Sequence, residues 1–389
     1  MKNLLYHLFF FICPVLMMSC NNSKSGTIAG HVVIIGVDGL SPNGVRNAAT
    51  PHIDGLIKEG SSTMYARSIL PTSSSSNWSA MIMGAGPEQT GITSNQWEPD
   101  DHVLNPVSKD QGGLFPTIFN LIRSSKPDAE LGAIYHWDGF GRLFEKGIID
   151  MDTTLPDVFL TTSHVVNYIK EKQPDFLFIQ LDNVDGAGHE FGHGSREYYK
   201  EIEKTDSLIG TIVEAIENSA MGANSVILLC ADHGGTGYGH GGESYDEITI
   251  PFVLYGKGVK KGYTIQHPVY QYDNAATVAM ILGLEQPIAW VGKPVKSAFV
   301  GNPDLVDPGF YQPIPKPQFA DKQYIQAFPG GLFFNDSALV TINPLTGAVI
   351  YYTTDGSEPD TSSQQYITPF TVDKTTTVKA VSYKGISRN

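Results

Sequence analysis

Two short motifs in this chain place a carboxylate and an imidazole directly after an apolar segment. In the first, Asp185-Gly-Ala-Gly-His189 follows the apolar run Phe176–Leu181. In the second, Asp232-His233-Gly-Gly follows the run Val226–Cys230. Carboxylate oxygen and imidazole nitrogen are ligands that zinc accepts, usually about four to an ion. One such pair alone would more often belong to a surface loop, but the two together indicate a metal site.

A third carboxylate and a third imidazole extend this set. Asp38 follows the apolar run Val32–Val37, and His240 comes shortly after the second motif and is followed by two glycines. Three carboxylates and three imidazoles are what a pair of zinc-like ions needs. Two ions about 4 Å apart can hold the attacking and leaving oxygens of a phosphoryl displacement. The sequence therefore favours a metal-dependent hydrolase.

The glycines in both motifs suggest how the ligands would reach an ion. In a loop, the two glycines between Asp185 and His189 would let the chain turn so that both side chains face one ion. Gly234-Gly235 would bend the backbone after Asp232 and His233 in the same way.

A hydroxyl-rich segment could supply a nucleophile. Leu70-Pro-Thr-Ser-Ser-Ser-Ser-Asn77 runs into a helix-like stretch that ends at Gly84. A serine at a helix N-terminus gains from the helix dipole and from free N–H groups, which favour an alkoxide and bind phosphate oxygens. Composition does not choose among the serines at positions 73–76, and a polar turn that caps a helix is the simpler explanation of this segment by itself.

Apolar runs that alternate with helical patterns indicate the fold. The runs are typical of parallel strands covered on both faces, and they are Val32–Val37, Leu131–Tyr135, Phe176–Leu181, Val226–Cys230 and Pro251–Tyr255. Between two of them, residues 198–216 carry apolar side chains at helical spacing. The alternation predicts an α/β fold, a doubly wound, mostly parallel sheet sandwiched by helices. Such sheets bind ligands beyond the carboxyl ends of their strands, where all three carboxylates would lie.

Composition changes along the chain suggest its organisation. We expect residues 1–20 to be a lipoprotein signal segment, 30–300 the catalytic domain, 301–320 a proline-rich linker and 321–389 a small all-β domain. The net charge of −14 argues against general nucleic-acid binding, which needs basic patches, but bound cations would still admit a phosphate substrate.

The N-terminus has the pattern of an export signal. Lys2 precedes an apolar run from Leu4 to Met18, which is short for a membrane span. The run ends just before Cys20 in a context that resembles a bacterial lipobox. We therefore predict an exported protein, in the periplasm or at the cell surface, anchored to the membrane by a lipid on Cys20, with ordinary secretion as the alternative.

The chain resembles the alkaline phosphatase superfamily, in particular its type I phosphodiesterase/nucleotide pyrophosphatase branch. Besides the motifs above, the matching pieces lie within residues 31–300 and include Val37-Asp38-Gly, Thr50-Pro-His-Ile-Asp54, Pro71-Thr72 through Asn77, Gly86-Pro-Glu and Gly91-Ile92. The resemblance implies that Ser74 is the nucleophile, because Ser74 stands two places after Thr72 and three before Asn77. It also implies that Asn95 binds a phosphate oxygen.

The resemblance further implies two Zn²⁺ ions, or another divalent metal, and a phosphoserine intermediate. The implied ligands form one group for each ion: Asp38, Ser74, Asp232 and His233, and Asp185, His189 and His240. Ser74 would attack phosphorus while the helix N-terminus and Asn95 stabilise the non-bridging oxygens.

Some positions depart from the phosphodiesterase pattern or leave a choice open. Ser74 replaces the usual threonine, and the third histidine comes early, at His240, with His267 as the later rival. Trp137 resembles the Trp-x-Gly element of the branch; it would line a substrate pocket or lie in the core. His193, four residues after His189, would either support the ligands from behind or lie in a solvated loop, and we expect the loop.

The C-terminal part carries a second resemblance. Ile350-Tyr-Tyr-Thr-Thr-Asp-Gly-Ser-Glu-Pro359, followed by Thr375-Thr-Thr-Val-Lys-Ala380, resembles the immunoglobulin-like domain at the C-terminus of some chitobiases and β-hexosaminidases. The resemblance implies a spacer or an accessory that contacts carbohydrate, without catalytic residues.

The preferred hypothesis is a two-metal hydrolase that cleaves phosphodiester or pyrophosphate bonds in a small phosphorylated substrate, such as a nucleotide. The absence of a Lys/Arg pair for a doubly charged phosphoryl group favours diesters. Arg67 or Arg142 could fill that role, so a phosphomonoesterase is the first alternative. A non-catalytic carbohydrate-binding lipoprotein is the second. A sulfatase is disfavoured, because no Cys/Ser-x-Pro-x-Arg context is present.

Overall fold

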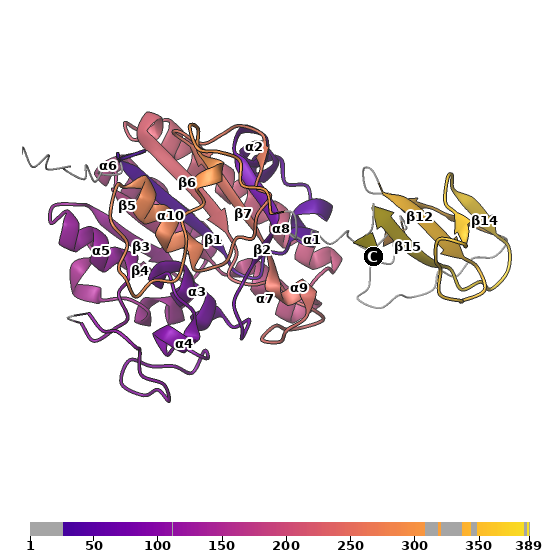
Figure 1. The fold of residues 1–389 in the computed structure, drawn as a ribbon, viewed down its shortest axis with the longest axis horizontal. Coiled ribbons are helices and arrows are strands. Elements are labelled where there is room, and N and C mark those ends of the chain that lie inside the picture. The colour runs from indigo at the N-terminus through magenta and orange to yellow at the C-terminus, as the bar shows by residue number, and fades with distance from the viewer. Residues whose placement is uncertain are drawn as a thin grey trace, which may run out of the picture.

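The computed structural model describes residues 26–110, 112–307, 318–319, 337–343, 348–384 and 387–388. Within these residues an eight-stranded sheet in the order β4-β3-β5-β1-β6-β7-β2-β8 forms the centre of the larger part of the molecule (Figure 1). Its strands are β1 His31–Val37, β2 Ser61–Arg67, β3 Leu131–Tyr135, β4 Met151–Thr154, β5 Phe176–Leu181, β6 Ser225–Cys230, β7 Thr249–Gly256 and β8 Tyr263–Thr264.

The central strands are the apolar runs of the sequence. β3, β5 and β6 are buried along their whole length, as is β1 apart from His31. In sheet order, the strands β4, β3, β5, β1 and β6 run parallel to one another, which confirms the predicted mostly parallel α/β sheet. β7 differs, since it runs antiparallel to both β6 and β2. Residues 231–248 stay near the carboxyl end of β6, where they carry two histidines of the site, so the chain re-enters the sheet from that edge.

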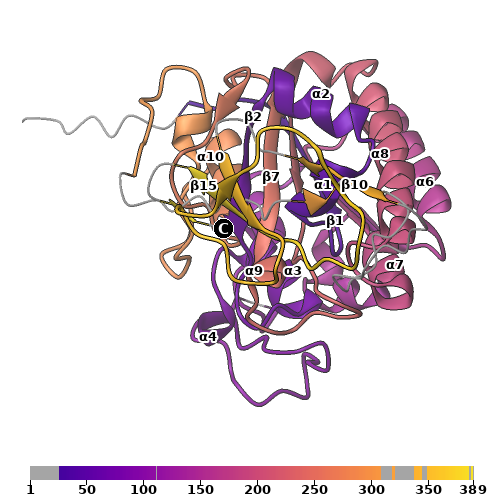
Figure 2. The same cartoon turned by 90° about the vertical axis from the view of Figure 1, so that its right-hand side faces the viewer.

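Helices cover both faces of this sheet, and Figure 2 shows it between α6 and α8 on one side and α10 on the other. On the first side α8 contacts the other four members of its layer, and the layer consists of α1 Pro42–Asn47, α2 Pro51–Glu59, α6 Val158–Lys172, α7 Asn183–Phe191 and α8 Arg196–Glu217. On the second side α3 contacts the other members, and this layer consists of α3 Ser74–Met83, α4 Pro87–Thr90, α5 Ile118–Ser125 and α10 Asp273–Ile281. A short helix, α9 Tyr245–Ile248, precedes β7.

The long helix α8 shows why the layers form. Its apolar side chains at helical spacing, among them Tyr198, Ile202, Ile209 and Ile212, are buried as the sequence predicts. Ser195 caps the helix by accepting a hydrogen bond from the Tyr198 backbone N–H.

Small antiparallel sheets form the C-terminal part of the described chain, as predicted. Their strands are β9 Gln318–Phe319, β10 Ala338–Val340, β11 Ile342–Asn343, β12 Val349–Thr353, β13 Gln364–Gln365, β14 Phe370–Val372, β15 Lys379–Lys384 and β16 Ser387–Arg388. Ile342, Ile350 and Tyr352 form a small core between them. The exact division into domains and linker stays a prediction.

Among the residues that the structure describes, no helix is long and apolar enough to cross a membrane. The predicted signal segment with Cys20 lies outside the described residues.

Candidate metal centre

The predicted carboxylates meet at the carboxyl ends of the three central strands. β1 lies between β5 and β6, and its register pairs Val37 with Leu181 and Gly36 with Cys230, so the three strands end at nearly the same level. Asp38 follows β1 directly, and Asp232 comes two residues after β6. The parallel sheet therefore gathers side chains that are almost 200 residues apart in sequence, as the sheet position predicts.

Asp185 and His189 lie on α7 and not in a loop, so the expected loop is wrong. Four positions apart on a helix, they share one face, and His189 Nε2 lies 3.0 Å from Asp185 Oδ2. One of the two glycines between them, Gly188, has another purpose. A Cβ at Gly188 would lie 2.4 Å from the His193 ring, so close packing requires glycine there.

Each of the three predicted histidine ligands is held by a backbone carbonyl. In every case Nδ1 lies within hydrogen-bond distance of a carbonyl oxygen, which leaves Nε2 to face the carboxylates. The pairs are His189 with Tyr238 at 2.9 Å, His233 with Gly234 at 2.8 Å and His240 with Thr72 at 2.7 Å. Fixing one ring nitrogen in this way is how proteins orient metal-binding imidazoles.

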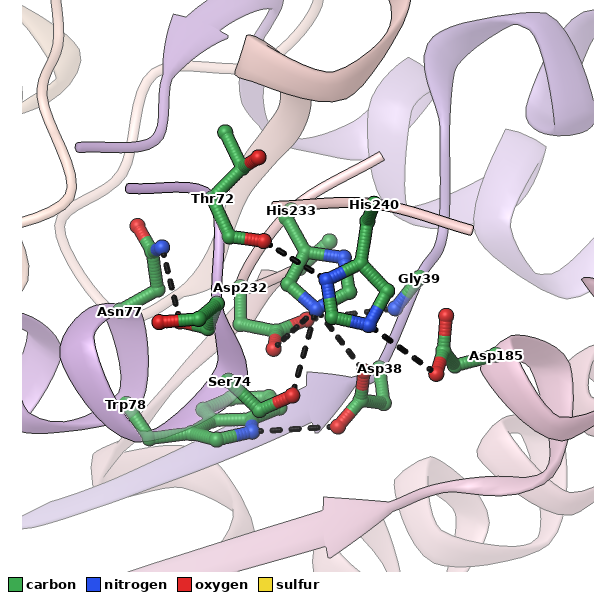
Figure 3. Close-up of polar contacts among 12 residues, drawn as sticks. Asp38, Gly39, Thr72, Ser74, Asn77, Trp78, Asp185, Asp232, His233 and His240 are labelled. Carbon is green, nitrogen blue, oxygen red and sulfur yellow. Dashed lines mark hydrogen bonds and ion pairs between the residues drawn. The ribbon is translucent and has the colours of Figure 1, made fainter. Parts of the chain in front are cut away.

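The inner half of the site consists of Asp38, Asp232 and His233, and we call it the inner cluster. His233 Nε2 lies 3.1 Å from Asp232 Oδ2, 3.5 Å from Asp38 Oδ1 and 3.3 Å from Ser74 Oγ (Figure 3). The side chains of His233 and Asp232 are 0% exposed. A cation here would be shielded from bulk water.

Asp185, His189 and His240 form the other half, which we call the outer cluster. One ligand atom from each lies within 4.8 Å of the others, and the same holds for Asp38, Asp185 and His233. Asp185 is thus shared between the halves. The structure brings together the residues of both ligand sets implied by the resemblance; Asp232, which is in neither of these two groups of atoms, lies beside His233.

The three buried carboxylates repel one another, and a bound cation would stabilise them. In the described part of the chain, one buried oxygen of each, Asp38 Oδ1, Asp185 Oδ1 and Asp232 Oδ2, has no hydrogen-bond partner. Burial, followed by repulsion from neighbouring carboxylates, raises the pKa of Asp38 and of Asp232 well above the usual range. Bound divalent cations would satisfy these oxygens and restore their negative charge.

In the outer cluster the carboxylate charge is balanced by imidazoles. Burial alone would raise the pKa of Asp185, but the hydrogen bond with His189 and the nearby imidazoles bring it to about 2. The same hydrogen bond raises the pKa of His189 to about 9. Burial, together with the nearby His240, lowers the pKa of His233 to about 3, so the inner imidazole is neutral and ready to bind a metal.

Ser74 is the serine that faces these ligands. It is the first residue of α3, is 6% exposed, and its Oγ lies 3.3 Å from His233 Nε2. The hydroxyls of Ser73 and Ser76 bond to each other at 2.9 Å instead. Ser74 thus lies at a helix N-terminus beside the predicted metal ligands.

Asn95 lies beside the same helix start. Its Oδ1 accepts a hydrogen bond from the Ser75 backbone N–H at 2.8 Å. Among the described residues its Nδ2 makes no hydrogen bond, so it remains available to a ligand.

Three residues of the site escaped the sequence-based prediction. Trp78 Nε1 donates to Asp38 Oδ2 at 3.2 Å, and Gln180 Nε2 lies 3.3 Å from both Asp38 Oδ2 and Asp182 Oδ1. Gln180 was detectable, because it is the one amide within the apolar run of β5. Asp182 was too, since it follows β5 as directly as Asp38 follows β1.

Two other histidines are now placed. His193 was expected in a solvated loop, which is wrong: it is 8% exposed, and its Nε2 lies 3.6 Å from Asp185 Oδ1. Unlike the three predicted ligands, its ring nitrogens have no hydrogen-bond partner within the described chain. His267 bonds to Ser297 Oγ at 2.8 Å and belongs to neither cluster, so geometry favours His240.

Trp137 lines a depression beside the inner cluster. The depression has a volume of about 420 Å³ and is lined by His136, Trp137, Asp138, Thr154, Leu155, Pro156 and Asp182. Gln180 connects it to the metal site, because its Oε1 accepts from the Trp137 backbone N–H at 2.8 Å while its Nε2 reaches Asp38. Trp137 is half-buried, which suits a pocket wall better than a core position.

Sequence comparison gives the family. Residues 32–119 and 129–245, more than half of the chain, match the type I phosphodiesterase/nucleotide pyrophosphatase family. The chain belongs to this family. Residues 328–389 match the chitobiase/β-hexosaminidase C-terminal domain. Both resemblances noted in the sequence are confirmed.

Curated relatives are distant and longer than this family member. Human GPI ethanolamine phosphate transferase 2, catalytic subunit, is 27% identical over 199 residues, which cover 47% of the chain and 20% of that protein. The bovine bis(5'-adenosyl)-triphosphatase ENPP4 is 21% identical over 237 residues, which cover 57% of the chain and 51% of that protein. The chain thus spans about half or less of these relatives.

Solved structures share the fold at low identity. Human ectonucleotide pyrophosphatase/phosphodiesterase 5 aligns with a TM-score of 0.59 and 12% identity, covering 70% of the chain and 100% of that structure. A mutant of the alkaline phosphatase PafA aligns with a TM-score of 0.57 and 12% identity, covering 70% and 99%. A 2-O GAG sulfatase aligns with a TM-score of 0.57 and 16% identity, covering 71% and 75%. These neighbours establish an alkaline phosphatase-like fold.

Proposed function

We propose that this family member is a two-metal phosphohydrolase that cleaves phosphodiester or pyrophosphate bonds with Ser74 as the nucleophile. The observation that carries the proposal is the contact of Ser74 Oγ with the inner cluster, 3.3 Å from His233 Nε2, at the first residue of a helix. No other hydroxyl of the serine run, in the part described, contacts these metal ligands.

Two divalent cations, which we propose to be Zn²⁺, would be held by residues of the two clusters. Asp38, Asp232 and His233, with Ser74, would hold one, and Asp185, His189 and His240 the other. Bound cations supply Lewis-acid stabilisation of the attacking and leaving oxygens and lower the pKa of the serine hydroxyl. The orphaned carboxylate oxygens and the carbonyl-anchored imidazoles support this assignment.

The chain's own groups would then position and attack the substrate. Ser74 Oγ attacks phosphorus and displaces the leaving oxygen, and water later hydrolyses the phosphoserine. Asn95 Nδ2 and the backbone N–H of Ser74, the first residue of α3, would donate to the non-bridging oxygens, while the Ser75 N–H holds Asn95 Oδ1. Ser74→Ala should reduce kcat on bis-p-nitrophenyl phosphate by at least ~10³-fold. Full turnover by this variant would overturn the proposal.

A diester preference is the finer part of the proposal. Residues 136–139, directly after β3, include no lysine or arginine, and the nearby Arg142 and Lys146 already pair with Glu98 and Asp152, which supports singly charged diesters over doubly charged monoesters. The alternative is a phosphomonoesterase. The ratio of kcat/KM for bis-p-nitrophenyl phosphate to that for p-nitrophenyl phosphate decides between them, since a ratio of one or less favours the monoesterase.

Nucleotides are the substrates we propose to test first. The matched bovine relative is named a bis(5'-adenosyl)-triphosphatase, and a murine ectonucleotide pyrophosphatase/phosphodiesterase 5 structure contains AMP. Trp137 in the depression beside Asp182 could stack on a base. Trp137→Ala should raise KM for a dinucleotide more than for bis-p-nitrophenyl phosphate.

We also propose that the protein is exported and lipid-anchored through Cys20. The support is the apolar N-terminal run that ends before Cys20. Labelled palmitate should appear in the mature protein and be absent from Cys20→Ser. Release of the labelled wild-type protein in soluble form would contradict the anchor.

Carbohydrate contact by the C-terminal module is a further proposal, supported by its family match. If the module were the whole function, the chain would be a non-catalytic binding lipoprotein. Metal analysis separates these alternatives, because the binding protein would contain no zinc and gain no stability on adding it.

A further inference from the structure

Arg142 connects three segments that surround the nucleophile. It ends the 3₁₀ helix η1, Asp138–Arg142, which follows Trp137. Its Nη2 donates to the backbone carbonyl of Asn95 and to Ser75 Oγ, the latter at 3.1 Å. Its guanidinium carbon lies 5.6 Å from the centre of the Trp137 ring. One side chain therefore spans the pocket wall, the asparagine and the start of α3.

Asn95 depends on such contacts for its position. It lies in residues 91–98, a segment without helix or extended strand pairing. Its side chain is fixed through Oδ1, which accepts from the Ser75 N–H at 2.8 Å, and its backbone carbonyl is fixed by Arg142. With Oδ1 and the carbonyl both held, the direction of Nδ2 is determined.

The charge of Arg142 is already used within the protein. Its Nη1 pairs with Glu98 Oε1 at 2.8 Å, and only 21% of the side chain is exposed. Glu98 belongs to the same segment as Asn95, so the ion pair also ties that segment to η1. A guanidinium with these partners is placed to orient its neighbours, and its charge is largely compensated before any phosphoryl group arrives.

We propose that Arg142 is a positioning residue that fixes Asn95 against the start of α3, so that Asn95 Nδ2 faces the phosphoryl group attacked by Ser74. The inference rests on the proposed function, since it takes Ser74 and Asn95 as parts of one site. Arg142 acts through Asn95 and does not contact the substrate.

A double-mutant cycle on the zinc-loaded full chain tests this route. Asn95→Ala, Arg142→Ala and the double variant are compared on bis-p-nitrophenyl phosphate. We expect Arg142→Ala to reduce kcat by about 10- to 100-fold with a smaller change in KM, because it displaces a donor to the transition state. The double variant should be no worse than Asn95→Ala alone, within about threefold. Effects that multiply would show a direct contact of Arg142 with substrate and overturn the inference.

Arg123 provides the matched control. Like Arg142 it pairs with a carboxylate, Asp150 Oδ2 at 2.6 Å, and donates to backbone carbonyls, including that of Ala129 at 2.8 Å. Its partners lie around the start of β3 and include no residue of the site. Arg123→Ala should lower thermal stability and leave kcat unchanged. Millimolar guanidinium should restore turnover to Arg142→Ala but not to the Asn95→Ala/Arg142→Ala variant; rescue of both would contradict a role through Asn95.

Binding of inorganic phosphate separates this inference from the proposed function. If the wild-type protein cleaves no diester, the proposed function fails, yet calorimetric phosphate affinities of the zinc-loaded variants still complete the cycle. We expect Asn95→Ala and Arg142→Ala to weaken phosphate binding by similar, non-additive factors. Unchanged affinity in Arg142→Ala, or additive losses, would refute the positioning role in either case.

Discussion

The inner and outer clusters consist of the same residue types, aspartate and histidine, but differ in their burial and in where their protons are held. In the inner cluster Asp38 and His233 are 1% and 0% exposed in their side chains, whereas His189 of the outer cluster is 48% exposed. The outer Asp185 pairs with His189, whose raised pKa keeps a proton between them. The inner carboxylates have raised pKa values, mainly through burial, and a neutral imidazole. Without a cation, the inner cluster therefore favours protons on its carboxyl groups, whereas the outer cluster keeps Asp185 ionised and holds a proton on His189.

The largest expected effect distinguishes the clusters by activity. Asp38→Asn should lower kcat/KM by about 10³-fold or more, because Ser74 adjoins the inner cluster and depends on the cation held there. His189→Asn should cost at least about tenfold less. Steady-state kinetics at saturating zinc measures both. His267→Asn, outside the two clusters, serves as a control and should keep wild-type rates; equal losses in the first two variants would refute the comparison.

The effect of replacing Asp232 on the stability of the protein should have opposite signs without metal and with zinc. The pKa of Asp232 is raised in the metal-free fold, so ionisation disfavours that fold and its stability falls as pH rises above about 4. Asp232→Asn removes this cost and should stabilise the metal-free protein by roughly 1 kcal/mol or more at pH 7. The same substitution should abolish much of the stabilisation by zinc. Urea unfolding with EDTA and with zinc tests both signs, and destabilisation in EDTA would contradict the first.

Metal binding to the outer cluster should depend on pH through His189. Its pKa of about 9 means that a cation must displace a proton at neutral pH. Zinc affinity should therefore rise with pH, by up to about tenfold per unit, and level off near pH 9. Calorimetry in buffers of different ionisation enthalpy measures the released proton. If His189→Asn released as many protons as the wild-type protein at pH 7, His189 would not be the source.

The smallest effect concerns His193, a buried histidine whose ring nitrogens bond to no carbonyl of the described residues. His193→Gln should change zinc affinity by no more than a few-fold, in contrast to His240→Gln, whose ring is held by Thr72. Because His193 packs against Gly188 and Gly235, the variant should still lose roughly 1–2 kcal/mol of stability. Comparable losses of zinc in the two variants would make His193 a ligand.

Local sequence predicted the elements that are apolar and continuous, and missed those that are not. The runs that form β1, β3, β5 and β6 were recognisable in the sequence, because parallel strands are buried on both faces and are therefore apolar throughout. β2, with the sequence Ser61-Ser-Thr-Met-Tyr-Ala-Arg67, gave no such signal, because its burial depends on β7 and β8 beside it. The helical setting of Asp185 was hidden by Gly186 and Gly188, of which Gly188 packs against His193.

The sequence by itself determined which groups can do the chemistry: three carboxylates and three imidazoles in segments that follow apolar strands, and a serine run at the start of a helix. Residue type and the positions of strands depend on local sequence, so a single sequence was enough to predict them. The choice of Ser74 rested on resemblance and is supported only by its contact with His233. Tertiary structure alone decided the anchoring carbonyls, the burial of His193 and the place of Arg142, because these depend on contacts between segments far apart in sequence.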